Sequence, residues 1–197
     1  MSEGAQSVQN SPRGRSLRGS KRLGLGAVLV IAIAGGLVAW LLIDRHSSSF
    51  SLDPVTPIAP QALTADGLKS TVHQIGQPVY WAGPKPGYTY ELERDADDNI
   101  HVTYLPPGKA LGAKGKFLVI GTFRFVNALS AIQRAAQNKG SHTLSLPDSG
   151  VAVYNPQQPS SYWFATPGSH YQAGVFTPNS PSLARQLVLS GQVVPVG

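Results

Sequence analysis

A stretch of 21 uncharged residues near the N-terminus constrains this chain more than any other feature. Residues 23–43 hold no Asp, Glu, Lys or Arg, and Trp40 lies near their far end. As a helix they would span about 31 Å, close to the roughly 30 Å of a bilayer's hydrocarbon core. A buried helix of a globular fold would show a polar face, and a cleaved signal peptide would have a shorter apolar core and a small-residue cleavage site. We therefore predict an uncleaved transmembrane signal anchor.

The charge distribution predicts the orientation of that segment. The 197-residue chain has a net charge of +6. Residues 1–22 carry five basic residues and one acidic residue, a net charge of +4, which leaves +2 for everything beyond residue 43. Because basic residues stay on the cytoplasmic side, we expect a cytoplasmic N-terminus and an extracytoplasmic C-terminal domain. The basic tail 1–22 has too few apolar residues to fold and is expected to be disordered. Orientation accounts for its charge, so no nucleic-acid partner is expected.

The exported part is expected to rely on its hydrophobic core. The chain has no cysteine, which excludes disulfides, thiolate metal sites and a cysteine nucleophile. Residues 44–60 combine serines with three prolines at three-residue spacing, a composition typical of an extended stalk. We place the folded domain at residues 61–197, enough for one domain.

Periodicity predicts an α+β fold for this domain. Apolar residues spaced as on one helix face predict a short helix between Thr64 and Gly76. Alternation over residues 88–93 and 100–104 predicts a β-hairpin. Further on, Gly121-Thr-Phe123 and Gly174-Val-Phe176 each precede a helix and a glycine stop. This repetition predicts two similar units in a ferredoxin-like (βαββαβ) C-terminal part.

Several short motifs resemble a family of uncharacterised single-pass membrane proteins of actinobacteria. They are PVYWAG at residues 78–83, GYTYEL at 87–92, YLPPG at 104–108 and SGQVVP at 190–195. The resemblance covers about residues 63–197. It implies a location in the cell envelope and implies no particular activity.

A second resemblance concerns the C-terminal part. Val119-Ile-Gly-Thr-Phe123 before an alanine-rich helix resembles the start of SPOR domains, ferredoxin-like modules that bind peptidoglycan glycan chains. This chain departs from them by a long insertion at residues 141–172 and by the additional N-terminal hairpin. The resemblance implies glycan binding but carries over no binding residue.

An acidic cluster in the predicted hairpin suggests calcium at first sight. The cluster consists of Asp95, Asp97, Asp98 and Asn99. An EF-hand loop needs Gly at its sixth position and a bidentate Glu at its twelfth, where this chain has Ile100 and Pro106. We therefore interpret the cluster as a solvated turn and predict no metal site.

Nothing in the sequence selects a catalytic group. The histidines, at positions 46, 73, 101, 142 and 170, show no metal-binding spacing. Ser141-His142 and Ser169-His170 are sequence neighbours, whose side chains would point to opposite faces of a strand. We therefore expect no catalytic residue, no cofactor and no enzymatic activity.

Two groups of residues are candidates for binding. Tyr80, Trp81 and Tyr88 belong to an aromatic cluster that is either core or, if exposed, a stacking platform. Lys109, Lys114 and Lys116 lie in a glycine-rich loop that lacks P-loop spacing but suits anionic wall polymers or lipid headgroups. The candidate binding residues are therefore Tyr80, Trp81, Tyr88, Lys109, Lys114 and Lys116.

Together these observations predict a membrane-anchored, non-catalytic, extracytoplasmic binding or assembly module of the bacterial cell envelope. Its expected partners are the membrane, through one span, and a cell-wall polymer or an envelope protein. SPOR-like glycan binding and an envelope hydrolase are the alternatives from other functional classes.

Overall fold

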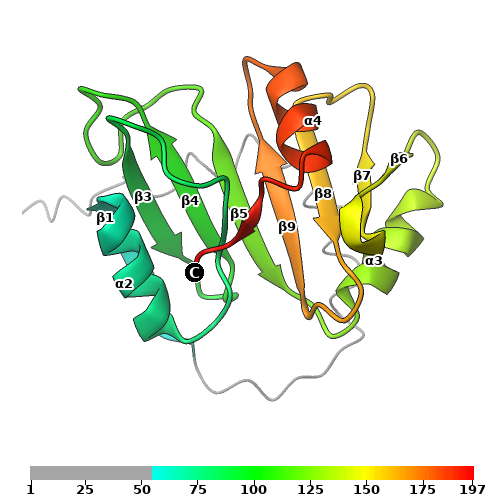
Figure 1. Ribbon diagram of the computed structural model, residues 1–197, viewed down its shortest axis with the longest axis horizontal. Helices are drawn as coiled ribbons and strands as arrows, with labels where there is room; N and C mark the ends of the chain where they lie inside the picture. Colours follow the sequence, from blue (N-terminus) through cyan, green and yellow to red (C-terminus); the bar gives the residue numbers. More distant parts are fainter. Residues whose placement is uncertain (1–54) are drawn as a thin grey trace, which may run out of the picture.

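Residues 55–197, the part of the chain that the computed structural model describes, form an eight-stranded antiparallel sheet (Figure 1). The strands, in spatial order, are β1 (Ile58–Leu63), β3 (Thr89–Arg94), β4 (Ile100–Leu105), β5 (Val119–Arg124), β9 (Tyr171–Phe176), β8 (Ser161–Ala165), β7 (Val151–Tyr154) and β6 (His142–Ser145). The helices are α2 (Ala65–Ile75), α3 (Ala128–Ala136) and α4 (Pro181–Leu189), with a short 3-10 helix at Pro147–Ser149. A separate two-stranded pair joins β2 (Tyr80–Trp81) to β10 (Val194–Pro195).

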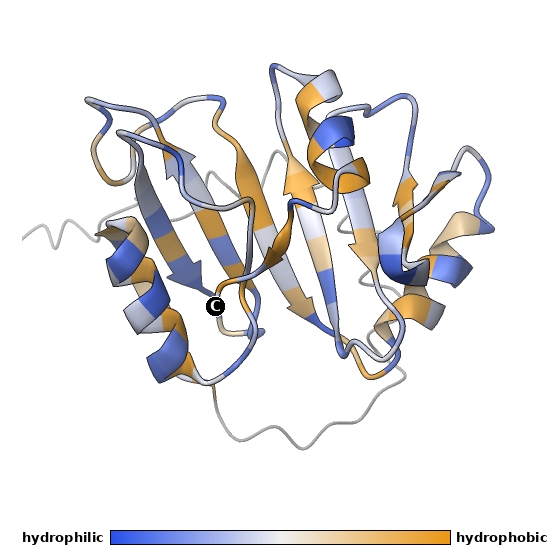
Figure 2. Ribbon diagram, in the orientation of Figure 1, coloured by the Kyte–Doolittle hydropathy of each residue, from blue (hydrophilic) through white to orange (hydrophobic). Residues whose placement is uncertain are grey.

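Alternation along the strands gives the sheet two different faces. In β3, Tyr90 and Leu92 pack into the same apolar cluster as Leu187 and Val188 of α4, and we call this side the α4 face. The opposite side, the α3 face, carries a second cluster in which Ile132 of α3 packs. Figure 2 shows the resulting bands of apolar and polar residues along the strands. Period-2 patterning therefore determines which side chains reach each layer.

The predicted helix at the start of the domain is confirmed as α2. The Thr64 side chain accepts a hydrogen bond from the backbone N–H of Gly67, and Gly76 ends the helix in the left-handed conformation. Leu68 and Val72 are buried against the α4 face. β1, which was not expected, begins at Ile58 and so takes up the last residues of the predicted stalk.

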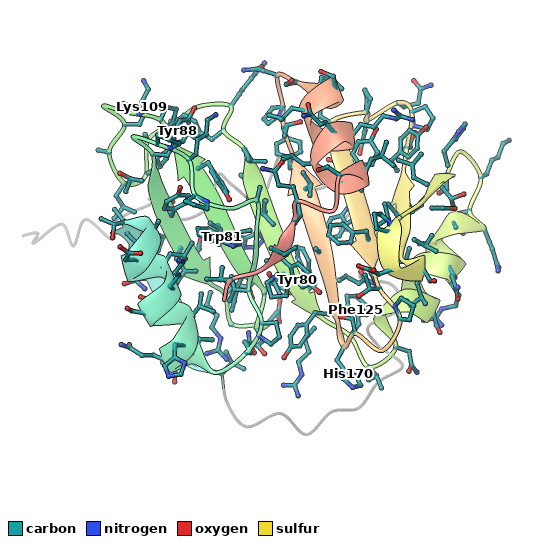
Figure 3. The ribbon with its side chains drawn as sticks, viewed as in Figure 1. Tyr80, Trp81, Tyr88, Lys109, Phe125 and His170 are labelled. Carbon is teal, nitrogen blue, oxygen red and sulfur yellow. The ribbon has the colours of Figure 1, made fainter. Side chains whose placement is uncertain are left out.

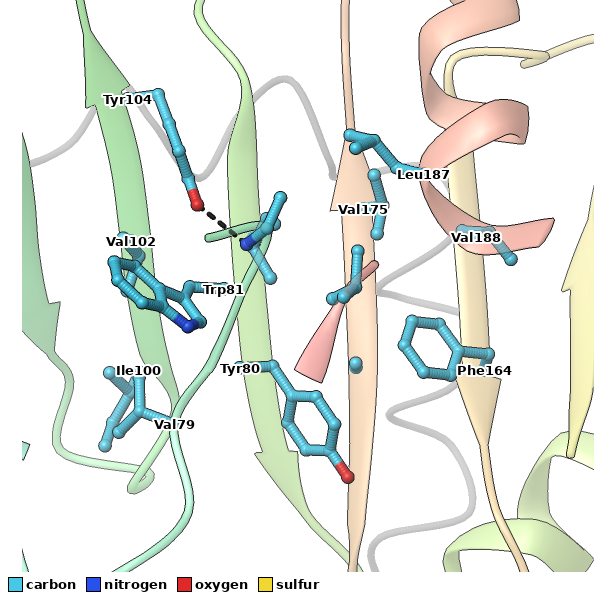
Figure 4. Packing of buried hydrophobic residues seen from close by; sticks show 14 of the residues in the cluster. Val79, Tyr80, Trp81, Ile100, Val102, Tyr104, Phe164, Val175, Leu187 and Val188 are labelled. Atoms are coloured by element: carbon cyan, nitrogen blue, oxygen red, sulfur yellow. Dashed lines mark hydrogen bonds between the residues drawn. The ribbon is translucent and has the colours of Figure 1, made fainter. Parts of the chain in front are cut away.

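The segment 79–82 lies across the α4 face and closes the core (Figure 4). The backbone N–H of Tyr80 donates to Thr122 Oγ1 at 2.8 Å, and the N–H of Ala82 donates to the Tyr104 hydroxyl at 2.7 Å. That hydroxyl in turn donates to the carbonyl of Gly83. Burial raises the pKa of Tyr104 far above its usual value, and the hydrogen bond from Ala82 only partly opposes this shift. These side chains of the sheet, together with the pairing to β10, satisfy the buried backbone groups of the segment.

The predicted ferredoxin-like C-terminal part is wrong. A ferredoxin-like unit would have its closing strand beside β5, but β4 occupies that position and β10 pairs with β2 instead. The two helices also lie on opposite faces. Trp163 packs in the α3 cluster, whereas its neighbour Phe164 packs in the α4 cluster. The fold is therefore one continuous antiparallel sheet with helices on both sides, and not an α+β fold with a separate βαββαβ half.

The repeated G-x-F motif has a packing explanation. Gly121 and Gly174 are directly opposite each other in the β5–β9 pair. The rings of Phe123 and Trp163 lie over these glycines, with centroids 4.7 Å apart. A Cβ atom at position 121 would lie 2.5 Å from Cε2 of Phe123, and one at 174 would lie 3.1 Å from Cζ3 of Trp163. The glycines make room for two aromatic rings and do not mark a duplicated unit.

The prediction of a transmembrane protein finds no support in the described part of the chain and is corrected. No helix within residues 55–197 is long and apolar enough to cross a membrane, and α2 has 11 residues. The predicted tail 1–22, the predicted anchor 23–43 and the stalk up to residue 54 lie outside the described residues. Residues 55–197 accordingly form a β-rich domain with three α-helices.

Candidate binding surface

The structure separates the six candidate binding residues into two groups. Figure 3 labels Tyr80, Trp81, Tyr88 and Lys109. Tyr80 and Trp81 are core residues with exposed fractions of 9% and 5%. The Trp81 ring meets Tyr90 edge-on at a centroid distance of 5.9 Å, and Tyr80 meets Phe164 in the same way at 6.0 Å. Neither ring forms a surface platform, so we do not carry them into the binding surface.

Tyr88 lies half-buried in the connection between β2 and β3, next to a lysine that sequence reasoning missed. Its backbone N–H donates to the carbonyl of Lys85, which closes a tight turn. The Lys85 ammonium lies 4.2 Å from the centroid of the Tyr88 ring, within range of a cation–π contact. Lys85 could have been found from the sequence, because it lies in the Gly-Pro-Lys-Pro-Gly turn directly before Tyr88.

The connection between β4 and β5 presents the other three lysines. Lys109, Lys114 and Lys116 are all exposed. The loop turns at Pro106, whose carbonyl accepts from the N–H of Lys109. The N–H of Gly112 donates to Glu91 Oε2 at 2.9 Å. This bond fixes the loop to β3, so a buried carboxylate positions a basic loop.

Both connections lie at one end of the sheet, because Thr89 at the start of β3 is opposite Leu105 at the end of β4. A Cβ atom on Gly87 would lie 3.2 Å from Cγ of Pro107, so the two loops are in contact. Figure 3 shows Tyr88 and Lys109 at this end. We call residues 83–88 and 106–116 together the lysine end.

The lysine end has a strongly one-sided charge. It holds four of the six lysines in residues 55–197 and no Asp, Glu or Arg. The nearest acidic group shown to contact it, Glu91, has an exposed fraction of 7% and already accepts from Gly112. Exposed ammonium groups without neighbouring carboxylates are suited to binding an anionic partner.

The opposite end of β3 and β4, which we call the Asp98 end, uses its acidic residues for structure. Asp95 accepts hydrogen bonds from the backbone N–H groups of Asp97 and Asn99 and from the Asn99 side chain. Asp98, with an exposed fraction of 3%, pairs with Arg94 at 2.7 Å. The predicted solvated turn is therefore a hydrogen-bonded turn in which Asp97 is exposed and Asp98 is buried.

No group of three or more metal-ligating side chains that could hold a metal ion occurs among residues 55–197. In the two serine–histidine pairs, the side chains of Ser169 and His170 contact backbone carbonyl groups, and His142 is exposed. Ser169 Oγ donates to the carbonyl of Tyr171, and His170 Nδ1 lies 2.9 Å from the carbonyl oxygen of Val126. His142 is exposed on the edge strand β6. His46 lies outside the described residues.

A titratable pair on the α3 face links β3 to β4. Glu93 and His101 are directly opposite each other, and the His101 ring packs edge-on against Phe123 at 5.6 Å. Burial lowers the pKa of His101, although the nearby Asp95 carboxylate partly opposes this shift. Burial raises the pKa of Glu93, and the negative charges of Glu91 and Asp95 raise it further.

The lowered pKa of His101 predicts a loss of stability in mild acid. As the pH falls below about 6.5, the unfolded chain takes up a proton on this side chain while the folded chain resists protonation. The contribution of His101 to the free energy of unfolding should therefore decrease between pH 6.5 and its lower folded-state pKa. Urea denaturation at a series of pH values should show a smaller acid-side decrease for His101→Gln than for the parent. Glu93→Gln serves as the opposite control, because a raised carboxyl pKa favours the folded state as the pH falls. Identical pH profiles for the parent and His101→Gln would contradict a lowered pKa of His101 in the folded chain.

No family model matches the chain, and no curated protein and no solved structure was found to be similar to it.

Proposed function

We propose that residues 55–197 form a non-catalytic binding module of the bacterial cell envelope that contacts an anionic partner through the lysine end. The observation that carries the proposal is the convergence of four lysines on two touching loops that contain no carboxylate. The fold supplies the support, because the 83–88 connection leads into β3, the 106–116 loop joins β4 to β5, and Glu91 fixes the longer loop. A rigid sheet that presents charged loops is a common arrangement for binding surfaces.

The proposed location outside the cytoplasm rests on the sequence. The net charge of +4 in residues 1–22 favours retention of the N-terminus in the cytoplasm, because basic residues beside an apolar segment stay on that side. An alkaline phosphatase fusion to the C-terminus tests this location directly. The enzyme should be active in the fusion if the domain is exported, and an inactive but intact fusion would contradict the proposed location.

The two alternative functions receive less support. A SPOR-like glycan site was expected on a ferredoxin-like sheet, but here α3 and α4 pack on opposite faces. A serine hydrolase would need a nucleophile and a base in contact. Ser169 is hydrogen-bonded to Tyr171 and His170 contacts Val126, so this pair does not supply them.

Removing charge from the lysine end should weaken binding to the cell wall. The double variant Lys109→Gln/Lys114→Gln removes two exposed ammonium groups, and each such group near an anionic surface commonly changes affinity by roughly fivefold. The measurement is co-sedimentation of the purified full-length chain with purified bacterial cell wall, where we expect at least a tenfold weaker association for the variant.

The matched control is Lys69→Gln/Lys139→Gln, which removes the same charge from two other exposed sites. This control should sediment as the parent does. Equal sedimentation of both double variants with the parent would contradict the proposal, as would an equal loss in both.

A further inference from the structure

The chain enters the domain at the end of the sheet that is opposite the lysine end. β1 and β3 are antiparallel, with Ile58 opposite Arg94 and Leu63 opposite Tyr90. The start of β1 therefore lies at the Asp98 end, and its last residue lies near the beginning of β3. Six strand residues cover roughly 17 Å from first to last. A partner held at the lysine end thus lies on the far side of these strands from residue 55.

The chemistry of the lysine end favours many spaced negative charges over one small anion. The four lysines lie on two separate loops, and three of them share the exposed 106–116 loop. Planar recognition of a carboxylate is typically provided by the arginine fork, and the lysine end has no arginine. Lysine ammonium groups act as point charges, which suit phosphate groups repeated along a flexible chain.

The aromatic content of the lysine end does not favour the binding of nucleic-acid bases. Tyr88 is its one aromatic side chain within residues 83–88 and 106–116, and the Lys85 ammonium lies over its ring. Proteins that bind single-stranded nucleic acids combine basic grooves with several rings on which bases stack. A phosphodiester chain without bases therefore fits this surface better than a nucleic acid does.

We infer that the lysine end binds a linear phosphodiester polymer of the poly(alditol phosphate) kind, located on the side of the domain away from residue 55. This inference rests on the proposed function and specifies its ligand class. An anionic lipid surface is the competing source of phosphate, and the vesicles named below test it separately.

The test uses the full-length chain, captured on a sensor through an N-terminal tag, with poly(glycerol phosphate) as the probe. We expect binding that weakens with salt, and at least tenfold weaker binding for Lys109→Gln/Lys114→Gln. If each lysine contacts one phosphate, the slope of log affinity against log salt should fall by about 0.7 for each lysine removed. Lys69→Gln/Lys139→Gln should bind as the parent does.

Three further probes separate failure of this inference from failure of the proposed function. They are polyglutamate, an oligothymidylate and vesicles of phosphatidylglycerol and phosphatidylcholine. If Lys109 and Lys114 govern binding to one of these probes while poly(glycerol phosphate) does not bind, the ligand class is wrong and the binding surface stands. If no probe binds in a way that depends on these lysines, both the inference and the proposed function are overturned. Lysine-dependent binding that is strongest for poly(glycerol phosphate) supports both.

Discussion

Replacing Trp81 with alanine should lower the free energy of unfolding by about 3–5 kcal/mol, the cost of removing a large buried aromatic side chain. Trp81 has an exposed fraction of 5% and packs edge-on against Tyr90. It also pairs with Val194, so its segment holds the C-terminal strand β10 in place. Urea denaturation followed by far-UV circular dichroism measures the loss.

Two variants make this result interpretable. Trp81→Phe retains a ring in the same space and should lose clearly less stability, which keeps the test informative if Trp81→Ala does not fold. Tyr88→Ala removes a half-buried ring from the lysine end and should cost about 1 kcal/mol or less. If Trp81→Ala unfolds at the same urea concentration as the parent, the core position of Trp81 is wrong and a surface role returns.

Adding a single methyl group at Gly121 should destabilise the domain by about 1–3 kcal/mol through overpacking. An alanine Cβ would lie 2.5 Å from Cε2 of Phe123, whose ring is held between Trp163 and His101. Intrinsic preference alone predicts the reverse, because alanine costs less backbone entropy than glycine in a strand. Denaturant unfolding of Gly121→Ala therefore distinguishes crowding from backbone preference.

A double-mutant cycle identifies the ring responsible. In the Phe123→Leu background the same Gly121→Ala substitution should cost clearly less, since the atoms that it meets are absent. An equal cost in both backgrounds would show that Phe123 is not the constraint and would remove our explanation of the repeated G-x-F motif.

Local signals in the sequence were sufficient for some elements of the fold. The helix α2 forms between the Thr64 cap and Gly76, as predicted. The hairpin β3–β4 also forms, because its residues alternate with period two over both strands. The cap joins Thr64 to Gly67, and residues 95–99 alone join the two strands of the hairpin, so local patterning is enough.

Other features depend on contacts between distant segments and were missed or wrong. β10 pairs with β2, more than a hundred residues earlier in the chain. The position beside β5 that a ferredoxin-like fold would give to β10 is occupied by β4. The G-x-F motif predicts a repeat from the sequence alone, although its glycines face each other under Phe123 and Trp163. No local signal in the sequence distinguishes the predicted arrangement from the observed one, since the same residue pattern is compatible with both.

The candidate surface was predictable only in part. The lysines of the 106–116 loop stood out as an uncompensated charge in a glycine-rich segment. Lys85 did not, because its role depends on the contact of its turn with Pro107 and on its position over Tyr88. For Tyr80 and Trp81 the sequence favours the core but leaves a surface platform open, and the crossing of segment 79–82 over the sheet places both in the core.

Site-specific photocrosslinking in intact bacterial cells tests the central claim most directly. A photoreactive amino acid replaces Lys109 at the lysine end or, in a second variant, the exposed Asp97 at the Asp98 end. We expect adducts with anionic envelope polymer from position 109 and none from position 97. Adducts from position 97 with none from position 109 would contradict the assignment of the lysine end as the binding surface.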